Sequence, residues 1–260
     1  MIVDTHCHLT MDALAPRVDQ VIDDAVAAGV TRMITVCVTS ENAMAVQALA
    51  SRRPEVWCSA GVHPLYSHHP VDWAVIRDAA NHPRCVAWGE MGLDNHYEEP
   101  PRSTQDRILA EQVALIESAQ GEGVRKPCII HCREAFDDLL AVLGSSRLDP
   151  ARCVFHCFTG GPDDARRVLD FGAMISFTGI ATFRSAAAIA EAARLTPADR
   201  IMIETDAPFL TPEPHRKTWP NEPRFLRHTA AFLAAQRGES LEAFSAATTA
   251  NAERFFGLGG

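Results

Sequence analysis

The sequence predicts an α/β protein that folds as a (β/α)8, TIM-like barrel. Short apolar, β-rich runs alternate with Ala-rich stretches of helical pattern along the chain, as in repeated β-α units around a parallel sheet. Eight such units within 260 residues fit a barrel better than a doubly wound sheet. The hydrophobic content of 47% suffices for one large core, and no extended Ser- or Gly-rich linker divides the chain, so we expect one domain over residues 1–260.

The expected strands are the apolar, β-rich runs, in chain order 2–6, 33–38, 56–60, 85–89, 128–132, 152–157, 173–177 and 201–205. The expected helices are the Ala-rich stretches between and after them, at 16–28, 41–50, 71–80, 103–122, 134–143, 163–171 and 186–193, with one or two more within 222–256.

The net charge and the lack of targeting signals argue against some classes of protein. The formal net charge of −9 argues against a broad basic patch that grips duplex DNA, although an anionic substrate can still be held by bound cations. No signal-like start and no apolar run of membrane-spanning length is found, so we expect a cytoplasmic protein without membrane contact. The oligomeric state is left open, and a monomer is compatible with the sequence.

The eight cysteines predict buried thiols rather than disulfides. Cys7, Cys132 and Cys157 each follow a histidine in an expected strand, so alternation points them away from it, toward the covering helices. The other cysteines also lie in β-like runs, where a free Cys behaves as a small buried hydrophobe: Cys37, Cys58, Cys85, Cys128 and Cys153. We expect all eight to be reduced, in a reducing compartment.

Residues of metal-ligand type recur at the ends of the expected strands. The first strand leads into Asp4-Thr5-His6-Cys7-His8, and because alternate residues of a strand share a face, His6 and His8 point the same way. Later strands end at His63, Glu90, His131, His156 and Asp206. The active site of this barrel fold lies where the C-terminal strand ends meet their loops, so these side chains converge on one rim and predict a metal site.

Short motifs continue in order along nearly the whole chain. They are Asp4-Thr5-His6-Cys7-His8-Leu9, Gly61-Val62-His63-Pro64, Gly89-Glu90-Met91-Gly92-Leu93-Asp94, Ile129-Ile130-His131-Cys132-Arg133-Glu134-Ala135, Phe155-His156-Cys157-Phe158-Thr159-Gly160, Ile175-Ser176-Phe177-Thr178-Gly179-Ile180, Glu204-Thr205-Asp206-Ala207-Pro208, Pro214-His215-Arg216 and Asn221-Glu222-Pro223. This series resembles the TatD family of metal-dependent hydrolases and deoxyribonucleases, in the amidohydrolase-like barrel superfamily. Two departures are mild: Cys132-Arg133-Glu134 stands where the family more often has Ser-Arg-Asp, and Ala207 where it often has Ser.

The resemblance implies a dinuclear metal centre. Four residues would hold one divalent ion: His6, His8, Glu90 and Asp206. Glu90, His131 and His156 would hold a second, so that Glu90 bridges the two, which a carboxylate can do because it has two oxygens. Mixed histidine and carboxylate ligands leave Mg, Mn and Zn open, along with Fe, Co and Ni. The imidazoles favour Zn or Mn, whereas the family's nuclease activity is usually associated with Mg.

The expected chemistry is hydrolysis by a water that the two cations activate. Asp206 is expected to be both a ligand and the general base. His63, in a Gly-x-His-Pro turn, is expected to contact or protonate the leaving group. Glu204 precedes Asp206 by two positions, so we expect it to face the same way and to recruit a third ion or hold one end of the substrate.

Three cationic or ionisable side chains are candidate substrate contacts. Arg133 offers a planar fork of donors to a phosphate, and its alternative is an ion pair with Glu134 or Asp137. His215 and Arg216 lie in a proline-rich loop that also contains Lys217 and Trp219. Such a loop could stack a nucleobase and hold a backbone, and its alternative is purely architectural, with Asn221-Glu222-Pro223 as a cap before the next helix.

Several other residues are assigned to packing or orientation. Asp94 is expected to orient a metal ligand. Asn251 is expected to cap the last helix. Phe158 and Phe183 are expected to pack in the core rather than line the mouth, and five further histidines are expected on the surface or in loops: His68, His69, His82, His96 and His228.

Two functions remain open at this point. The first is a deoxyribonuclease of the 3′-5′ exonuclease type, acting on single strands or 3′ ends. The second is a metal-dependent esterase or amidase, for example one that deacylates aminoacyl-RNA, since the superfamily's site attacks phosphoryl and carbonyl centres alike. The fold by itself does not choose between them.

Overall fold

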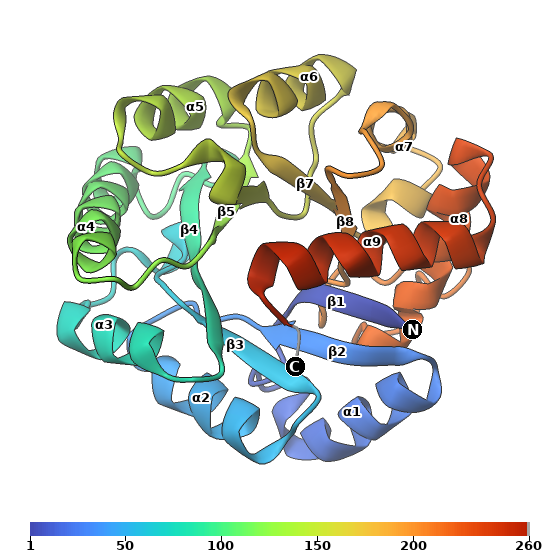
Figure 1. Cartoon of the computed structure of the whole chain (residues 1–260), viewed down its shortest axis with the longest axis horizontal. Helices are drawn as coiled ribbons and strands as arrows, with labels where there is room; N and C mark the ends of the chain where they lie inside the picture. The colour runs from blue at the N-terminus through green and yellow to red at the C-terminus, as the bar shows by residue number, and fades with distance from the viewer. Residues whose placement is uncertain (259–260) are drawn as a thin grey trace.

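Eight parallel strands form one sheet, hydrogen-bonded in chain order from β1 to β8, in the computed structural model, which describes residues 1–258 (Figure 1). Helices alternate with the strands and surround them (Figure 1). The expected (β/α)8, TIM-like fold is therefore confirmed. The strands are β1 Ile2–Cys7, β2 Val30–Thr35, β3 Val56–Ala60, β4 Cys85–Asp94, β5 Cys128–Arg133, β6 Cys153–Phe155, β7 Met174–Phe177 and β8 Ile201–Ile203.

The α-helices cover the outside of the sheet. They are α1 Val18–Ala27, α2 Ala43–Arg52, α3 Trp73–Asn81, α4 Arg102–Gly121, α5 Phe136–Ser145, α6 Pro162–Phe171, α7 Ala187–Leu195, α8 Leu226–Arg237 and α9 Leu241–Phe256. Short 3-10 helices lie in the connections: η1 Ala15–Arg17, η2 Pro64–Tyr66, η3 Pro150–Arg152, η4 Gly179–Thr182 and η5 Pro223–Phe225.

The apolar core has two parts. One lies between the strands and the helices around them. The other fills the barrel, with Val3, Val86 and Val154 among its members, and it includes Phe256 and Leu258 from the end of the chain. Helix α9 crosses the near end of the barrel in Figure 1, so its last turn closes the apolar interior at the end opposite the polar rim.

The barrel closes between β1 and β8 through few backbone contacts. Cys7 and Ala207 form an isolated bridge, and the backbone N–H of Asp206 donates to His6 O at 2.9 Å. The buried Asp4 carboxylate adds a side-chain link, accepting from Thr205 N at 3.0 Å and Thr205 Oγ1 at 2.6 Å. The Asp4 side chain thus adds hydrogen bonds at the β1/β8 seam, the junction of these two strands, where backbone hydrogen bonds are few.

Some expected boundaries were wrong. Strand β2 begins at Val30, which pairs with Ile2, rather than at residue 33. Strand β4 continues past Glu90 to Asp94, because it pairs with β5 over its whole outer half. Strands β6 and β8 are shorter than expected, ending at Phe155 and Ile203.

Asn251 does not cap a helix. It lies inside the continuous helix α9, where its Nδ2 donates to Ala198 O and Ile201 O, both at 2.8 Å. Ser240 caps this helix instead, since its side chain accepts from Ala243 N. Asn251 therefore ties the last helix to the segment that enters β8.

The cysteines are all free, as expected, and seven of the eight are buried. Among residues 1–258, no helix combines the length and the apolar character that crossing a membrane requires.

Candidate metal centre

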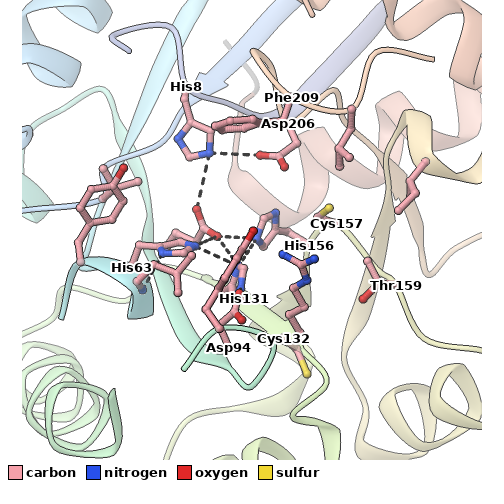
Figure 2. Close-up of a pocket in the computed structure, with 18 of the residues that line it drawn as sticks. His8, His63, Asp94, His131, Cys132, His156, Cys157, Thr159, Asp206 and Phe209 are labelled. Carbon is pink, nitrogen blue, oxygen red and sulfur yellow. Dashed lines mark hydrogen bonds and ion pairs between the residues drawn. The ribbon is translucent and has the colours of Figure 1, made fainter. Parts of the chain in front are cut away.

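A cavity of about 390 Å³ lies at the C-terminal ends of the strands (Figure 2). Most of the expected rim residues line it: His8, His63, Glu90, His131, His156 and Asp206. His6 is fully buried beside them, and its ring stacks on that of His156 with 3.9 Å between ring centroids. Residues from six strand ends, far apart in sequence, thus meet at one place, as the barrel topology requires.

Glu90 lies at the centre of this group, and its two oxygens face different partners. Its Oε1 is 2.6 Å from His156 Nε2 and 2.9 Å from His131 Nδ1. Its Oε2 is 3.2 Å from His6 Nε2 and 3.9 Å from His8 Nε2. The two ligand sets that the sequence resemblance implies would each use one of these oxygens.

Asp206 completes the side of the centre formed by β1 and β8. Its Oδ1 lies 3.2 Å from His8 Nε2 and 3.6 Å from His6 Nε2. The Asp206 backbone has a positive φ of 53° just after β8, and this turn directs the carboxylate back over the barrel end.

The residues fit divalent cations. Glu90 Oε2 is buried, and no donor within residues 1–258, including His6 Nε2 at 3.2 Å, is aligned to form a hydrogen bond with it. This is costly for a carboxylate oxygen unless a cation occupies the space beside it. Overlapping sets of three possible ligands recur around it: His6 with His8 and Glu90, His6 with His156 and Asp206, and His63 with Glu90 and His131. The described cavity thus offers nitrogen and oxygen ligands and open space on one side.

Two further carboxylates lie behind the imidazoles. Glu204 Oε1 is 3.1 Å from His156 Nδ1, and Asp94 Oδ2 is 3.0 Å from His131 Nε2. Each imidazole is therefore held between Glu90 and a second carboxylate, which fixes its ring orientation and its tautomer. The expectation that Asp94 orients a ligand agrees with this geometry.

The electrostatics of the cluster keep its carboxylates ionised. Burial alone would raise the pKa of Glu90, but the surrounding imidazoles, His156 first, outweigh it and lower that pKa well below its usual value. Burial also opposes ionisation of Asp206, yet the hydrogen bond from His8 and the nearby rings leave its pKa lowered. Both carboxylates are thus negatively charged at neutral pH and suited to cations.

The carboxylates in turn act to raise the pKa of the imidazoles that they contact. Burial would lower the pKa of His156, but the Glu90 and Glu204 carboxylates raise it well above 6.5. His63 has no carboxylate behind it, and burial lowers its pKa to about 4. The metal-free centre therefore carries a protonated His156 beside a neutral His63.

Glu204 is not where the sequence pattern placed it. Its carboxylate is 1% exposed, and it accepts from Cys157 N at 2.7 Å and from Thr5 Oγ1 at 3.2 Å. The strand ends at Ile203 and Asp206 has a left-handed backbone, so the alternation that would aim both carboxylates into the cavity does not apply. The position does not fit a third ion or a substrate contact.

Cys157 was also assigned to the wrong face. It lines the cavity beside His156 and is only partly buried, because its backbone, at a φ of 42°, has left the strand. Cys7 does point outward as expected, with Sγ donating to Ile34 O at 3.4 Å.

Asp4 is the residue that sequence reasoning missed. It is fully buried, and besides binding Thr205 it accepts from the N–H of His6 at 3.3 Å, so it holds the backbone between two ligand-bearing segments. Burial raises the pKa of Asp4 to about 7 against the lowering effect of these hydrogen bonds. A carboxylate two positions before the first histidine, in a buried strand, was the available signal.

Arg133 lines the cavity, and its guanidinium lies 5.2 Å from the centroid of the Tyr97 ring. The expected alternative, an ion pair with Glu134 or Asp137, does not form. Glu134 pairs with His96, and Asp137 pairs with Arg167. The positive charge of Arg133 thus remains available at the mouth of the site.

In the loop after β8, the two candidate substrate contacts face other side chains. His215 packs on Phe225 and His228, and Arg216 lies over the Phe183 ring at 4.1 Å, so neither lines the described cavity. Asn221 is fully buried and donates to Thr205 O and Phe209 O, so it braces the loop rather than capping a helix. Phe209 does line the cavity, and its ring centroid lies 6.0 Å from that of Trp219.

A cluster of histidines and carboxylates at this end of a (β/α)8 barrel is typical of metal-dependent hydrolases. A family model described as TatD related DNase matches residues 3–257. The chain therefore belongs to the TatD family of metal-dependent hydrolases, as the resemblance of its motifs indicated.

Individual relatives agree with this assignment. The uncharacterized metal-dependent hydrolase YcfH of Escherichia coli is 37% identical, over 98% of this chain and 95% of its own. The 3′-5′ ssDNA/RNA exonuclease TatD of Erwinia billingiae is 36% identical, over 98% of each chain. The crystal structure of YJJV, a TatD homolog from Escherichia coli, superposes with a TM-score of 0.90 at 27% identity, over 98% of each chain.

Proposed function

We propose that this protein is a nuclease that removes nucleotides from the 3′ end of single-stranded DNA, with two divalent cations held at the centre around Glu90. The observation that carries the hydrolytic part is the division of Glu90, whose Oε1 faces His131 and His156 while its Oε2 faces His6 and His8. The relative from Erwinia billingiae, named as a 3′-5′ exonuclease of single-stranded DNA and RNA, supports the substrate class.

The cavity supports an action on chain ends. Its volume of about 390 Å³ is that of a small-molecule pocket, so it accommodates a terminal nucleotide rather than a duplex. Leu65, Tyr66 and Phe209 form apolar and aromatic parts of its wall, against which a base can pack. A duplex would also require a basic surface that the net charge of −9 disfavours.

The charges of the residues at the cavity suit them to different roles in hydrolysis. Arg133 supplies the positive charge for a phosphate oxygen at the mouth. Asp206 is ionised and 14% exposed in its side chain, so it can accept a proton from the attacking water. Two divalent cations, of which Mg, Mn and Zn are the candidates, would supply the activation of that water and the polarisation of the phosphoryl oxygen when bound.

The test uses protein stripped of metal and then reloaded with Mg²⁺ or Mn²⁺. We expect the reloaded protein to shorten a single-stranded oligonucleotide from its 3′ end, leaving a 5′ label on progressively shorter products. An oligonucleotide blocked at its 3′ end should resist. Internal cleavage of the blocked strand would contradict the proposed action on chain ends.

An ester or amide substrate is the second candidate, and the apolar wall of the cavity is the observation that favours it. An acyl group could occupy the space proposed for the base. Protein that leaves every oligonucleotide intact, but releases the amino acid from an aminoacylated RNA, would replace the nuclease assignment with this one.

A further inference from the structure

His63 presents a hydrogen-bond donor to the cavity, and a backbone contact fixes which nitrogen carries the proton. His63 is the N-cap of η2, and its Nδ1 accepts from Leu65 N at 3.0 Å. Pro64 occupies the first position of that helix and has no N–H, so Leu65 provides the first backbone donor. This N–H needs an acceptor, and the ring supplies it.

The contact determines the tautomer of the ring. A nitrogen that accepts a hydrogen bond cannot carry a proton, so neither the imidazolium form nor the Nδ1–H tautomer fits this geometry. The remaining form is neutral, with its proton on Nε2. The backbone that carries the ring is also held in place, because the N–H of His63 donates to Val38 O at 3.0 Å.

The protonated nitrogen faces the centre of the site. His63 Nε2 lies 3.2 Å from Glu90 Oε1 and 3.2 Å from His131 Nδ1. These three atoms are close enough together for one ion to contact them all. A ligand nitrogen, however, must offer a lone pair, and here the lone pair is on the far side of the ring. His63 therefore differs from His131 and His156, whose far nitrogens each face a carboxylate and whose near nitrogens face Glu90.

We propose that His63 is a fixed, neutral hydrogen-bond donor to an oxygen of the substrate, and that it is neither a metal ligand nor an acid that gives up its proton. Loss of a proton from a neutral imidazole would leave an imidazolate, so the ring stabilises negative charge without proton transfer. His63 lines the cavity and lies beside Glu90, so a substrate oxygen next to that carboxylate is within its reach. The inference rests on the proposed hydrolytic function, and it refines the expectation that His63 contacts or protonates the leaving group.

The first test counts metal ions and does not depend on activity. His63→Ala and His63→Gln are loaded with Mn²⁺ beside the parent chain, and His68→Gln serves as a control, since His68 is an exposed histidine of the same loop. We expect all four proteins to hold the same number of ions per chain. Loss of an ion from His63→Ala would overturn the proposal.

The second test reads the tautomer directly. Nitrogen NMR of the parent chain loaded with Zn²⁺ should show the proton of His63 on Nε2, with Nδ1 unprotonated. His63→Gln identifies the resonance by its disappearance. A proton on Nδ1, or on both nitrogens at neutral pH, would overturn the proposal.

The third test separates a donor from an acid by the leaving group. Rates are compared on an oligonucleotide, whose alkoxide leaving group needs a proton, and on bis(4-nitrophenyl) phosphate, whose leaving group does not. We expect His63→Ala to lower kcat by about 100- to 1000-fold on both, and His63→Gln, which keeps an N–H donor, to recover part of it. A near-normal rate of His63→Ala on the nitrophenyl ester alone would show that His63 is an acid.

The outcomes distinguish the two proposals. If the parent chain cleaves no phosphodiester, the proposed nuclease function fails, and the kinetic comparison is made on the ester that the chain does cleave. If the parent chain is active and the ion count or the tautomer differs from the expectation, only the role of His63 fails.

Discussion

Glu204 Oε1 lies 3.1 Å from Nδ1 of His156, on the side of the ring opposite to the nitrogen that faces Glu90. A buried carboxylate and a central carboxylate thus hold one imidazole between them. This places Glu204 among the residues that position the site, directly behind the cavity-lining residues His156 and Cys157.

Substitution of Glu204 should therefore weaken metal binding. Glu204→Ala removes the partner of His156 Nδ1, so we expect the affinity for Mn²⁺ to fall by about 10- to 100-fold, measured by calorimetric titration. Glu204→Gln keeps an acceptor oxygen and should lose less. An unchanged affinity in both variants, with a correctly folded barrel, would exclude this role.

Glu90 should be the least replaceable residue of the centre. Glu90→Gln preserves the shape but removes the charge shared by the two ligand sets, so we expect metal content to fall and hydrolysis to drop by about 1000-fold or more. Glu134→Gln is the matched control, because Glu134 is 63% exposed and pairs only with His96 among the described residues. Elemental analysis and the rate of 3′ shortening give the two readouts, and a Glu90→Gln chain with full metal content and rate would contradict the assignment.

Metal uptake should release protons. The carboxylates raise the pKa of His156 well above 6.5, so the metal-free ring is protonated at neutral pH and a cation must displace that proton. We therefore expect affinity to increase as pH rises from about 6 to 8. Calorimetry at pH 7 in two buffers of different ionisation enthalpy measures the protons released, and identical heats in both buffers would refute the prediction.

The same shift acts on the stability of the metal-free protein. Because the folded-state pKa of His156 lies above the unfolded value of 6.5, its stabilising contribution is complete below pH 6.5 and is lost as pH rises through the folded pKa.

Asp4 should contribute to the stability of the β1/β8 seam. Asp4→Ala leaves the N–H and the hydroxyl of Thr205 without their buried acceptor, so we expect the free energy of unfolding to fall by about 3 kcal/mol. Asp4→Asn retains one acceptor oxygen and should lose about 1 kcal/mol. Denaturant unfolding of the metal-free proteins measures both, and equal losses would show that the hydrogen bonds are not the cause.

Gly92 should tolerate no side chain. A Cβ there would lie 1.9 Å from His131 O, and the φ of 150° is one that L side chains rarely adopt. We expect Gly92→Ala to displace β5 or to prevent folding. Gly121→Ala is the control, since nothing lies within 4 Å of a Cβ at that helical position. Thermal melting should show a large loss for the first variant and none for the second.

The sequence by itself determined the barrel and the residue types at its rim. Both follow from local patterns: alternating strand and helix runs, and ligand-type residues such as His131 and Glu90 at the ends of those runs. Because parallel strands of a barrel share one C-terminal end, the order of the strands is enough to predict that these residues converge.

The direction in which each side chain points depended on the tertiary structure. Cys157 and Glu204 were assigned by strand alternation, yet β6 and β8 end before them, and the positive φ of Cys157 turns the chain. Alternation predicts direction only within a strand, so it fails at the strand ends where the site is built.

Individual hydrogen bonds in the folded chain decided the remaining features of the site. The tautomer of His63 depends on the N–H of Leu65 at the start of η2, and the placement of Asp4 depends on Thr205, which is 201 residues away in sequence. Neither contact leaves a periodic signal: the first is a local turn contact that depends on the ring's rotamer, and the second joins distant segments that meet only after the barrel has closed. The sequence thus determined which groups reach the rim, and the folded chain decided what each group faces.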